Sequence, residues 1–230
     1  NQIINNLAKT HYRWNQNADV VVRMPTGAGT GAGPFHSQSN EAWFTKTPGL
    51  KIAYPAFPDD AKGLLIQSFE DPNPVLFFEH KKLYRSLKGN VPEGFYTTPF
   101  GKVRKVKEGH ELTIITYGLG VHIALEFAEK NPEISLEIVD LRTLIPLDTE
   151  TIYESVKKCN KVIILHEDTL TCGFGAELSA LISEHCFEDL DAPILRVASM
   201  DTPIPFNKKL EDQFMPNEEL AEAVERILKY

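Results

Sequence analysis

The sequence predicts an α/β fold in which parallel strands and helices alternate along the chain. Short apolar, β-branched runs typical of buried strands alternate with longer segments whose apolar residues recur at helical spacing. Strand cores such as 113–115 and 162–164 show no polar alternation, as expected where helices cover both faces of a sheet. A stretch rich in Pro, Gly and Thr, 88–100, has no periodicity and is the predicted linker between units 1–87 and 101–230.

The first unit is predicted to run helix, strand, loop, strand, helix, strand, an order that favours a parallel α/β layer. The opening helix covers residues 1–14, the strands 19–25, 50–55 and 73–80, and the second helix 59–71. Asp59 or Asp60 lies near the N-terminus of this second helix. Its expected apolar face consists of Ala61, Leu64, Leu65 and Phe69. The glycines and proline of TGAGTGAGPFHSQS, 26–39, exclude regular structure between the first two strands.

The second unit is more regular and is predicted to be a small doubly wound domain. Its strands are expected at 111–118, 135–142, 161–168 and 193–199. Its helices are expected at 121–130, 148–159, 174–187 and 217–230. Asp148 is placed to cap the second of these helices, with Glu150 and Thr151 in its first turn.

Composition excludes several classes of protein. The chain has 230 residues and a formal net charge of −8, with no basic stripe, so we expect no nucleic-acid partner. No apolar run approaches the roughly 18 residues of a membrane span, and no leader pattern is present, which predicts a cytoplasmic protein without a membrane partner. The three cysteines, Cys159, Cys172 and Cys186, lack metal-site spacing and are expected to be buried thiols. A surface helix with nothing before it, beginning at Asn1, suggests a fragment or a processed chain.

Two glycine patterns raise the question of a dinucleotide site. Gly27, Gly29 and Ala32 follow a strand, but Gly33, Pro34 and Phe35 come next and we expect no helix to start there, which the dinucleotide fingerprint requires. The turn with Gly118 and Gly120 does lie between a strand and a helix, and Asp140 ends the next strand. Its third small position is occupied by Ile123. A tight turn with close helix packing explains these glycines, and a dinucleotide-dependent oxidoreductase is the alternative.

His36 stands between the glycine-rich run and a small polar cluster. One interpretation is a loop histidine hydrogen-bonded to Ser37, Gln38 and Ser39. The other is a functional residue, because histidine exchanges a proton near neutral pH and a glycine-rich loop lets a ligand approach the backbone closely. The other histidines fall on or beside apolar segments; His80 and His122 are expected to be satisfied core or surface residues, and His166 to have a structural or interface role.

Several motifs together resemble one family. They are VVRMPTGAGTGAGPFHSQSNEAWFTKTPGLKIAYPAFPDDAKGLL, EDPNPVLFFEHKKLYR, VDLRTLIPLD, HEDTLTCGFGAEL and DAPILRVASMDTPIP, and they span nearly the whole chain. The sequence resembles the β subunit of the thiamine-diphosphate-dependent E1 component of 2-oxo acid dehydrogenase complexes. The resemblance implies the second half of a pyrimidine-binding domain over 1–87, then a transketolase C-terminal-type domain over 101–230. Branched-chain enzymes resemble it most, through Phe35, Ser39 and NPVLFFEHKKLYR, and pyruvate and acetoin enzymes remain alternatives.

The resemblance also implies site residues. The histidine of the family's H-S-Q-S motif lines the active-site channel, so His36 is expected beside the cofactor and to transfer protons during acyl transfer to the lipoyl group. A potassium ion is implied on backbone carbonyls and one carboxylate, with Asp71 as the only side-chain ligand. The matching positions are Ala18, Val20, Val21, Ser68, Asp71 and Asn73. From the residues alone, Asp71 closing the end of its helix is an equal alternative.

The family's working unit is an α2β2 heterotetramer that passes its acyl group to a lipoyl-bearing E2 acyltransferase. The implied activity is oxidative decarboxylation of a branched-chain 2-oxo acid, with thiamine diphosphate shared with the α subunit and Mg²⁺ held there. The glutamate that activates the cofactor's pyrimidine lies in a first half-domain that these residues do not contain, and Glu41, Glu70 and Glu79 do not match it. A non-catalytic docking or structural protein of the same fold is therefore an alternative, and in a eukaryote the mitochondrial matrix is the expected location.

Overall fold

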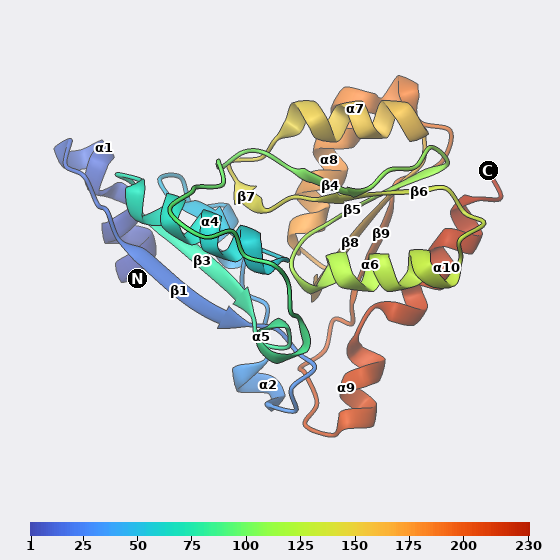
Figure 1. Cartoon of the computed structure of the whole chain (residues 1–230), viewed down its shortest axis with the longest axis horizontal. Coiled ribbons are helices and arrows are strands. Elements are labelled where there is room, and N and C mark those ends of the chain that lie inside the picture. Colours follow the sequence, from blue (N-terminus) through green and yellow to red (C-terminus); the bar gives the residue numbers. More distant parts are fainter.

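Two β-sheets organise the chain in the computed structural model, which describes all residues from 1 to 230 (Figure 1). The first sheet has the strand order β1–β3–β2–β7. Its strands are β1 (Val21–Thr26), β3 (Val75–His80), β2 (Lys51–Ala53) and β7 (Thr143–Ile145). The first three are parallel, as the sequence predicts, and β7 is antiparallel to β2. Because β7 follows the 88–100 stretch, the chain crosses back to complete the first sheet.

The second sheet has the order β4–β6–β5–β8–β9. Its strands are β4 (Arg104–Lys107), β6 (Leu136–Asp140), β5 (Leu112–Thr116), β8 (Val162–Thr169) and β9 (Leu195–Ser199). The last four are parallel and lie where the sequence predicts them. The antiparallel edge strand β4 was not predicted, because its four residues RKVK are half-buried and carry no apolar run.

The longer helices also match their predicted positions. They are α4 (Pro58–Glu70), α6 (Leu119–Lys130), α7 (Thr149–Cys159), α8 (Phe174–Cys186) and α10 (Asn217–Ile227). The opening segment Gln2–Trp14 is helical but irregular, with a π-helical turn, a 3₁₀ turn and then α1 (Thr10–Trp14). The cap on α7 is confirmed, since Asp148 accepts a hydrogen bond from the backbone N–H of Thr151. Shorter helical pieces were not predicted, namely α2 (Gly33–His36), α3 (Ala42–Thr45), α5 (Leu83–Ser86), the 3₁₀ turn Phe187–Asp189 and α9 (Lys208–Phe214).

Helices cover both faces of the second sheet, which explains its unbroken apolar strands. Ile114 belongs to the buried cluster that contains residues of α6 and α10. Its neighbour Ile115 belongs to the cluster that contains residues of α7 and α8, together with buried residues of the first sheet. Successive side chains of a strand point to opposite faces, so both must be apolar here.

The apolar face predicted for α4 is partly wrong. Leu64 is fully buried, but Phe69 is 65% exposed. The buried stripe of α4 instead includes Asp60 and Ser68, four residues to either side of Leu64. The Ser68 hydroxyl donates a hydrogen bond to the carbonyl oxygen of Leu64 at 2.7 Å. The Asp60 carboxylate forms ion pairs with Arg104 and Arg142. Because two residues of the buried stripe are polar, the spacing of apolar residues alone did not predict which face of α4 is buried.

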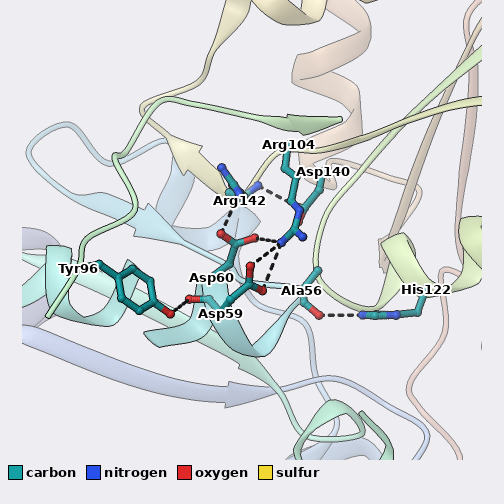
Figure 2. Close-up of polar contacts among 8 residues, drawn as sticks. All are labelled: Ala56, Asp59, Asp60, Tyr96, Arg104, His122, Asp140 and Arg142. Carbon is teal, nitrogen blue, oxygen red and sulfur yellow. Dashed lines mark hydrogen bonds and ion pairs between the residues drawn. The ribbon is translucent and has the colours of Figure 1, made fainter. Parts of the chain in front are cut away.

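An ion-pair cluster joins the start of α4 to the second sheet (Figure 2). The Asp60 carboxylate lies 2.9 Å from Nη1 of Arg104 in β4 and 2.9 Å from Nη2 of Arg142, which follows β6. Asp59 lies 3.1 Å from the same Arg104 nitrogen. Burial raises the pKa of Asp140, at the end of β6, to about 7, against the opposing effect of the backbone N–H of Arg142. The cluster fixes the two sheets relative to each other.

No helix is long and apolar enough to cross a membrane.

Candidate functional site at the junction of the two sheets

His36 is the last residue of α2, a single helical turn in the segment predicted to be irregular. The prediction that no helix starts after Gly33 is therefore wrong, although a four-residue turn is too short to act as the helix of a dinucleotide fold. The imidazole is exposed and makes no hydrogen bond. The polar cluster bonds elsewhere, since the Gln38 carbonyl accepts from the Thr26 hydroxyl at 2.5 Å. The interpretation of His36 as a histidine hydrogen-bonded into that cluster does not hold.

The glycine-rich loop before His36 is folded around carboxylates of the second half of the chain. Glycines 27, 29, 31 and 33 all have positive φ, between 69° and 94°. Alternation between right- and left-handed backbone turns successive N–H groups toward one concavity, which binds anions. The N–H of Ala28 donates to Oε1 of Glu167 at 2.6 Å, and that of Gly29 to Oε1 of Glu211 at 2.8 Å. The protein's own carboxylates thus fill this concavity, which agrees with the rejection of a dinucleotide site at this loop.

A cavity of about 550 Å³ opens beside α2, between the two halves of the chain. One wall comes from residues 34–43 and the other from 167–169 and 202–214. Phe35 and Trp43 at this cavity are 81% and 61% exposed, so its rim is aromatic. The lining residues are Pro34, Phe35, Gln38, Ser39, Asn40, Trp43, Glu167, Asp168, Thr169, Thr202, Pro203, Ile204 and Phe214. His36 directly follows Phe35 in the sequence, and its own side chain is not part of the lining.

Glu167 closes the floor of this cavity through a buried pair with His80. Nε2 of the His80 ring lies 2.5 Å from Oε2 of Glu167, and both side chains are almost fully buried. Burial pushes the pKa of Glu167 upward, but His80, the Ala28 N–H and the Ser39 hydroxyl outweigh it and hold this pKa below its usual range. Gly27 makes room for the pair, because a Cβ there would lie 2.0 Å from the His80 ring. The expectation that His80 is a core residue is confirmed, but the ring is only half satisfied, because its buried Nδ1 has no hydrogen-bond partner.

Two more carboxyl groups near the junction have raised pKa values. Burial, reinforced by the charge of Asp168, raises the pKa of Glu41 to about 8. Its Oε1 accepts from the Tyr117 hydroxyl at 2.9 Å, and its buried Oε2 has no partner. Burial also raises the pKa of Asp168 to about 6, with Glu167 adding to the shift and the N–H of Thr169 opposing it. The junction therefore holds carboxyl groups that exchange protons near neutral pH.

Sequence reasoning missed most of this junction. Glu167 and Asp168 follow the core of strand β8, and carboxyl ends of parallel strands line the functional edge of an α/β sheet, so the HEDT motif carried a usable signal. No sequence signal pointed to Glu211, since the glycines to which it is hydrogen-bonded lie about 180 residues earlier in the chain.

The other histidines have structural surroundings. His166 is fully buried between Gly173 and Gly175, where added Cβ atoms would lie 2.6 and 2.5 Å from its ring. Burial lowers its pKa to about 4, so the ring is neutral at pH 7, and a structural role fits it better than an interface role. Nε2 of His122 lies 2.7 Å from the carbonyl oxygen of Ala56 (Figure 2).

Packing accounts for the second glycine pattern. A Cβ on Gly118 would lie 2.6 Å from the Tyr54 ring, and one on Gly120 would lie 2.2 Å from the Thr116 hydroxyl. Asp140 is fully buried and bonds to the N–H of Arg142, so its carboxylate is not free to bind a ribose. The tight-turn interpretation explains these residues and the dinucleotide interpretation does not.

The six positions implied for potassium gather at one corner of the first sheet. The N–H of Ala18 donates to the carbonyl of Pro72, and the carbonyl of Val20 accepts from Val75. Asp71 accepts from the Lys51 ammonium at 2.5 Å and from Asn73. Burial raises the pKa of Asp71, but these bonds to Lys51 and Asn73 lower it more. The Asp71 carboxylate, the one implied side-chain ligand, is thus already paired with Lys51, and the carbonyls of Ala18 and Val20 accept backbone hydrogen bonds.

Cys159 and Cys186 are buried as predicted, whereas Cys172 is exposed. The prediction for Cys172 is wrong because it lies in the turn after β8 with a φ of 58°, outside the apolar segments on either side.

Known proteins match both halves of the chain. Residues 2–86 match the pyrimidine binding domain of transketolase, and residues 101–220 match the transketolase C-terminal domain. A solved structure described as a split-gene transketolase, in an inactive β4 tetramer, has a TM-score of 0.76 and covers 99% of this chain and 70% of that chain, at 22% identity. At this identity the likeness shows the fold alone, and with the domain matches it confirms the predicted fold class.

Three curated relatives share more of the sequence. The 2-oxoisovalerate dehydrogenase subunit beta of Bacillus subtilis is 48% identical, covering 99% of this chain and 71% of its own. An acetoin:2,6-dichlorophenolindophenol oxidoreductase subunit beta of Cupriavidus necator is 43% identical, over 99% and 69%. The pyruvate dehydrogenase E1 component subunit beta of Rickettsia felis is 40% identical, over 99% and 71%. The chain thus spans roughly seven tenths of the length of each of these relatives.

Proposed function

Since this chain belongs to the E1 β subunits of the 2-oxo acid dehydrogenases, we propose that with an α subunit it decarboxylates branched-chain 2-oxo acids and transfers the acyl group to lipoyl-E2. The family predicted from the sequence motifs is thereby confirmed. The proposed assembly is an α2β2 heterotetramer, and the proposed cofactor is thiamine diphosphate with Mg²⁺ on the α subunit.

The position of His36 is the observation that supports this activity most. Its exposed imidazole ends a helical turn beside a cavity between the two halves, and no internal bond occupies either ring nitrogen. An imidazole without an internal partner can hydrogen-bond to a bound molecule and act as its general acid or base. We assign it proton transfer to and from the 2-oxo acid substrate and the lipoyl group.

The residues present fit one wall of a cofactor site. Thiamine diphosphate, when bound, supplies the nucleophilic carbon and the electron sink that decarboxylation needs. Glu41 is enclosed and bonded to Tyr117, and Glu79 is bonded to Arg23 at 2.7 Å and to Tyr84 at 3.0 Å. Glu70 is on the surface. Internal partners thus occupy Glu41 and Glu79, and Glu70 does not line the cavity, so we assign none of the three to the pyrimidine and propose that the α partner completes the site.

We propose a branched-chain 2-oxo acid as the substrate, from sequence identity to relatives and from the cavity lining. The 2-oxoisovalerate relatives compared are 40% to 48% identical, the acetoin relatives 43% and the pyruvate relatives 38% to 40%, so only the upper end of the range favours a branched-chain substrate. Phe35, at the mouth of the cavity, adds apolar surface that suits a branched aliphatic side chain.

The decisive experiment assembles the chain with an α subunit, thiamine diphosphate and Mg²⁺, and assays 2-oxoisovalerate, pyruvate and acetoin. We expect turnover only with the partner, and the highest kcat/KM for 2-oxoisovalerate. His36→Ala is expected to lower acyl transfer about a hundredfold, whereas His110→Ala, which removes another exposed imidazole, leaves it unchanged. No turnover, while a full-length β relative is active in the same assay, would favour the non-catalytic docking protein. Preference for pyruvate or acetoin would correct the substrate.

We also propose a potassium ion at Ala18, Val20, Val21, Ser68, Asp71 and Asn73. The backbone pairing of Ala18 with Pro72 and of Val20 with Val75 brings these positions beside the turn that carries the buried Asp71 carboxylate, which supports the proposal. A thermal melt in KCl should then lie above one in choline chloride at equal ionic strength, and Asp71→Asn should abolish the difference. Equal melting temperatures in both salts would exclude the ion.

A further inference from the structure

Glu211, on α9, meets the glycine-rich loop from the opposite half of the chain. Its side chain is 2% exposed, and Oε1 accepts from the Gly29 N–H at 2.8 Å. The Gly31 N–H donates to Oε2 at 2.9 Å and to Oε1 at 3.2 Å. No lysine or arginine forms an ion pair with this carboxylate, so the loop amides are its hydrogen-bond donors. Figure 1 shows α9 beside the loop that carries α2.

The buried Glu211 carboxylate and the loop amides stabilise each other. Backbone amides that point into one concavity satisfy a negative charge that would otherwise be desolvated and unpaired. In return, the charge fixes a segment with glycine at every second position, and glycine loses more backbone freedom on folding than any other residue. Hydrogen bonds to a charged acceptor are stronger than neutral ones, so two such amides hold the loop firmly.

A second contact, between Phe206 and Gly33, lies closer to His36 in the sequence. Phe206 lies against Gly33, the first residue of α2, and a Cβ on Gly33 would come within 2.2 Å of the Phe206 ring. Segment 206–211 therefore touches the loop at Gly29, Gly31 and Gly33. His36 follows three residues later, and the N–H of Ser37 closes the turn on the carbonyl of Gly33. Only Pro34 and Phe35 separate the contact at Gly33 from His36 along the chain.

We propose that Glu211 is a positioning residue, whose carboxylate holds the glycine-rich loop and thereby sets the position of the His36 imidazole beside the cavity. The consequence for turnover rests on the proposed function of His36. The contact between Glu211 and the loop is itself a property of this chain and can be measured without turnover.

The first measurement is amide hydrogen exchange of the whole chain, in wild type and in Glu211→Ala and Glu211→Gln. Asp212→Ala, which removes an exposed acid from the next position of the same helix, is the matched control. We expect exchange of the Gly29 and Gly31 amides to accelerate about tenfold or more in Glu211→Ala, and less in Glu211→Gln, which keeps one acceptor oxygen. Exchange in the core of β5 and in the control should not change. Unchanged loop exchange in Glu211→Ala would overturn the proposal.

The second measurement follows His36 itself. The ring C–H signal of His36, identified in NMR spectra by its loss in His36→Ala, should shift or broaden in Glu211→Ala and stay in place in Asp212→Ala. In the enzyme assembled with an α subunit, Glu211→Ala should lower kcat about tenfold while KM for the 2-oxo acid changes little, and Glu211→Gln should restore part of the loss.

A loosened loop with an unmoved His36 signal would overturn the positioning role, and so would an equal kcat in Glu211→Ala and the control. An inactive wild-type assembly would contradict the proposed function of the protein. In that case the exchange and NMR results alone still decide whether Glu211 positions His36.

Discussion

The hydroxyl of Tyr117 donates a 2.9 Å hydrogen bond to Oε1 of Glu41, which joins the end of β5 to the segment after His36. The second oxygen of Glu41 is buried without a partner, and burial, with the charge of Asp168, raises its pKa to about 8. At pH 7 the folded protein therefore keeps a proton on Glu41, whereas the unfolded chain releases it near pH 4.3. This proton uptake ties the stability of the junction to pH.

We predict that Glu41→Gln flattens the pH dependence of stability. A carboxyl whose pKa is raised by folding contributes stability that is complete below its unfolded pKa and is lost as the pH rises through its folded pKa. Wild type should lose about 1–3 kcal/mol more than Glu41→Gln between pH 5 and pH 9. Urea unfolding at several pH values measures this, and parallel profiles for the two proteins would contradict it.

The pair of His80 and Glu167 gives a second prediction, on stability alone. Glu167→Ala leaves the His80 ring and the Ala28 N–H buried without their acceptor. Breaking a buried pair from one side typically costs about 3–5 kcal/mol. We expect a loss of that size in the free energy of unfolding. Glu177→Ala, an exposed acid on α8, should change it by less than about 0.5 kcal/mol, and similar losses in both variants would show that the pair contributes nothing specific.

The sequence allowed the parallel strands and long helices to be predicted because they depend on local patterns. Ile114 and Ile115 are both buried, and the cap of Asp148 requires only a neighbour three residues on. Strand β4 lacked such a pattern, since pairing with β6 holds its polar residues in place. Helix α9 has a local cap at Asn207, but its buried Glu211 is held by a distant loop.

The site was less accessible to sequence reasoning for the same reason. His36 could be singled out from its motif, whereas its surroundings arise only when the two halves pack. The glycine-rich pattern of the loop is typical of phosphate binding, but in this structure Glu211 fills its concavity. Which acid meets which amide is decided by tertiary packing, which a single sequence does not display.

Gly118 allows a test of the packing interpretation of its turn. Its φ of 55° is strained for other residues, and a Cβ would lie 2.6 Å from the buried Tyr54 ring. Gly94 also has a positive φ, 76°, but has nothing within 4 Å of the Cβ position. Gly94→Ala should therefore cost only the backbone strain, about 1 kcal/mol, and Gly118→Ala about 3 kcal/mol or more. Thermal and urea unfolding compare them, and equal costs would refute the packing account.

In the ion-pair cluster of Figure 2, two neighbouring acids on α4 differ in burial and in the number of arginines that they contact. Asp60 is 2% exposed and bonds to both Arg104 and Arg142, whereas the side chain of Asp59 is 35% exposed and bonds only to Arg104 among the arginines. Asp60→Ala leaves two partly buried guanidinium groups facing each other without their shared anion, so we expect a loss of about 2–4 kcal/mol in the free energy of unfolding.

Asp59→Ala should cost less than about 1 kcal/mol, because solvent screens an exposed pair and Arg104 keeps Asp60. Since the cluster joins α4 to β4 and to the residue after β6, Asp60→Ala should also loosen the two sheets from each other. We expect its urea transition to become broader or biphasic, and that of Asp59→Ala to remain a single step. Equal effects of the two substitutions would mean that burial does not set the strength of these pairs and that the cluster does not couple the sheets.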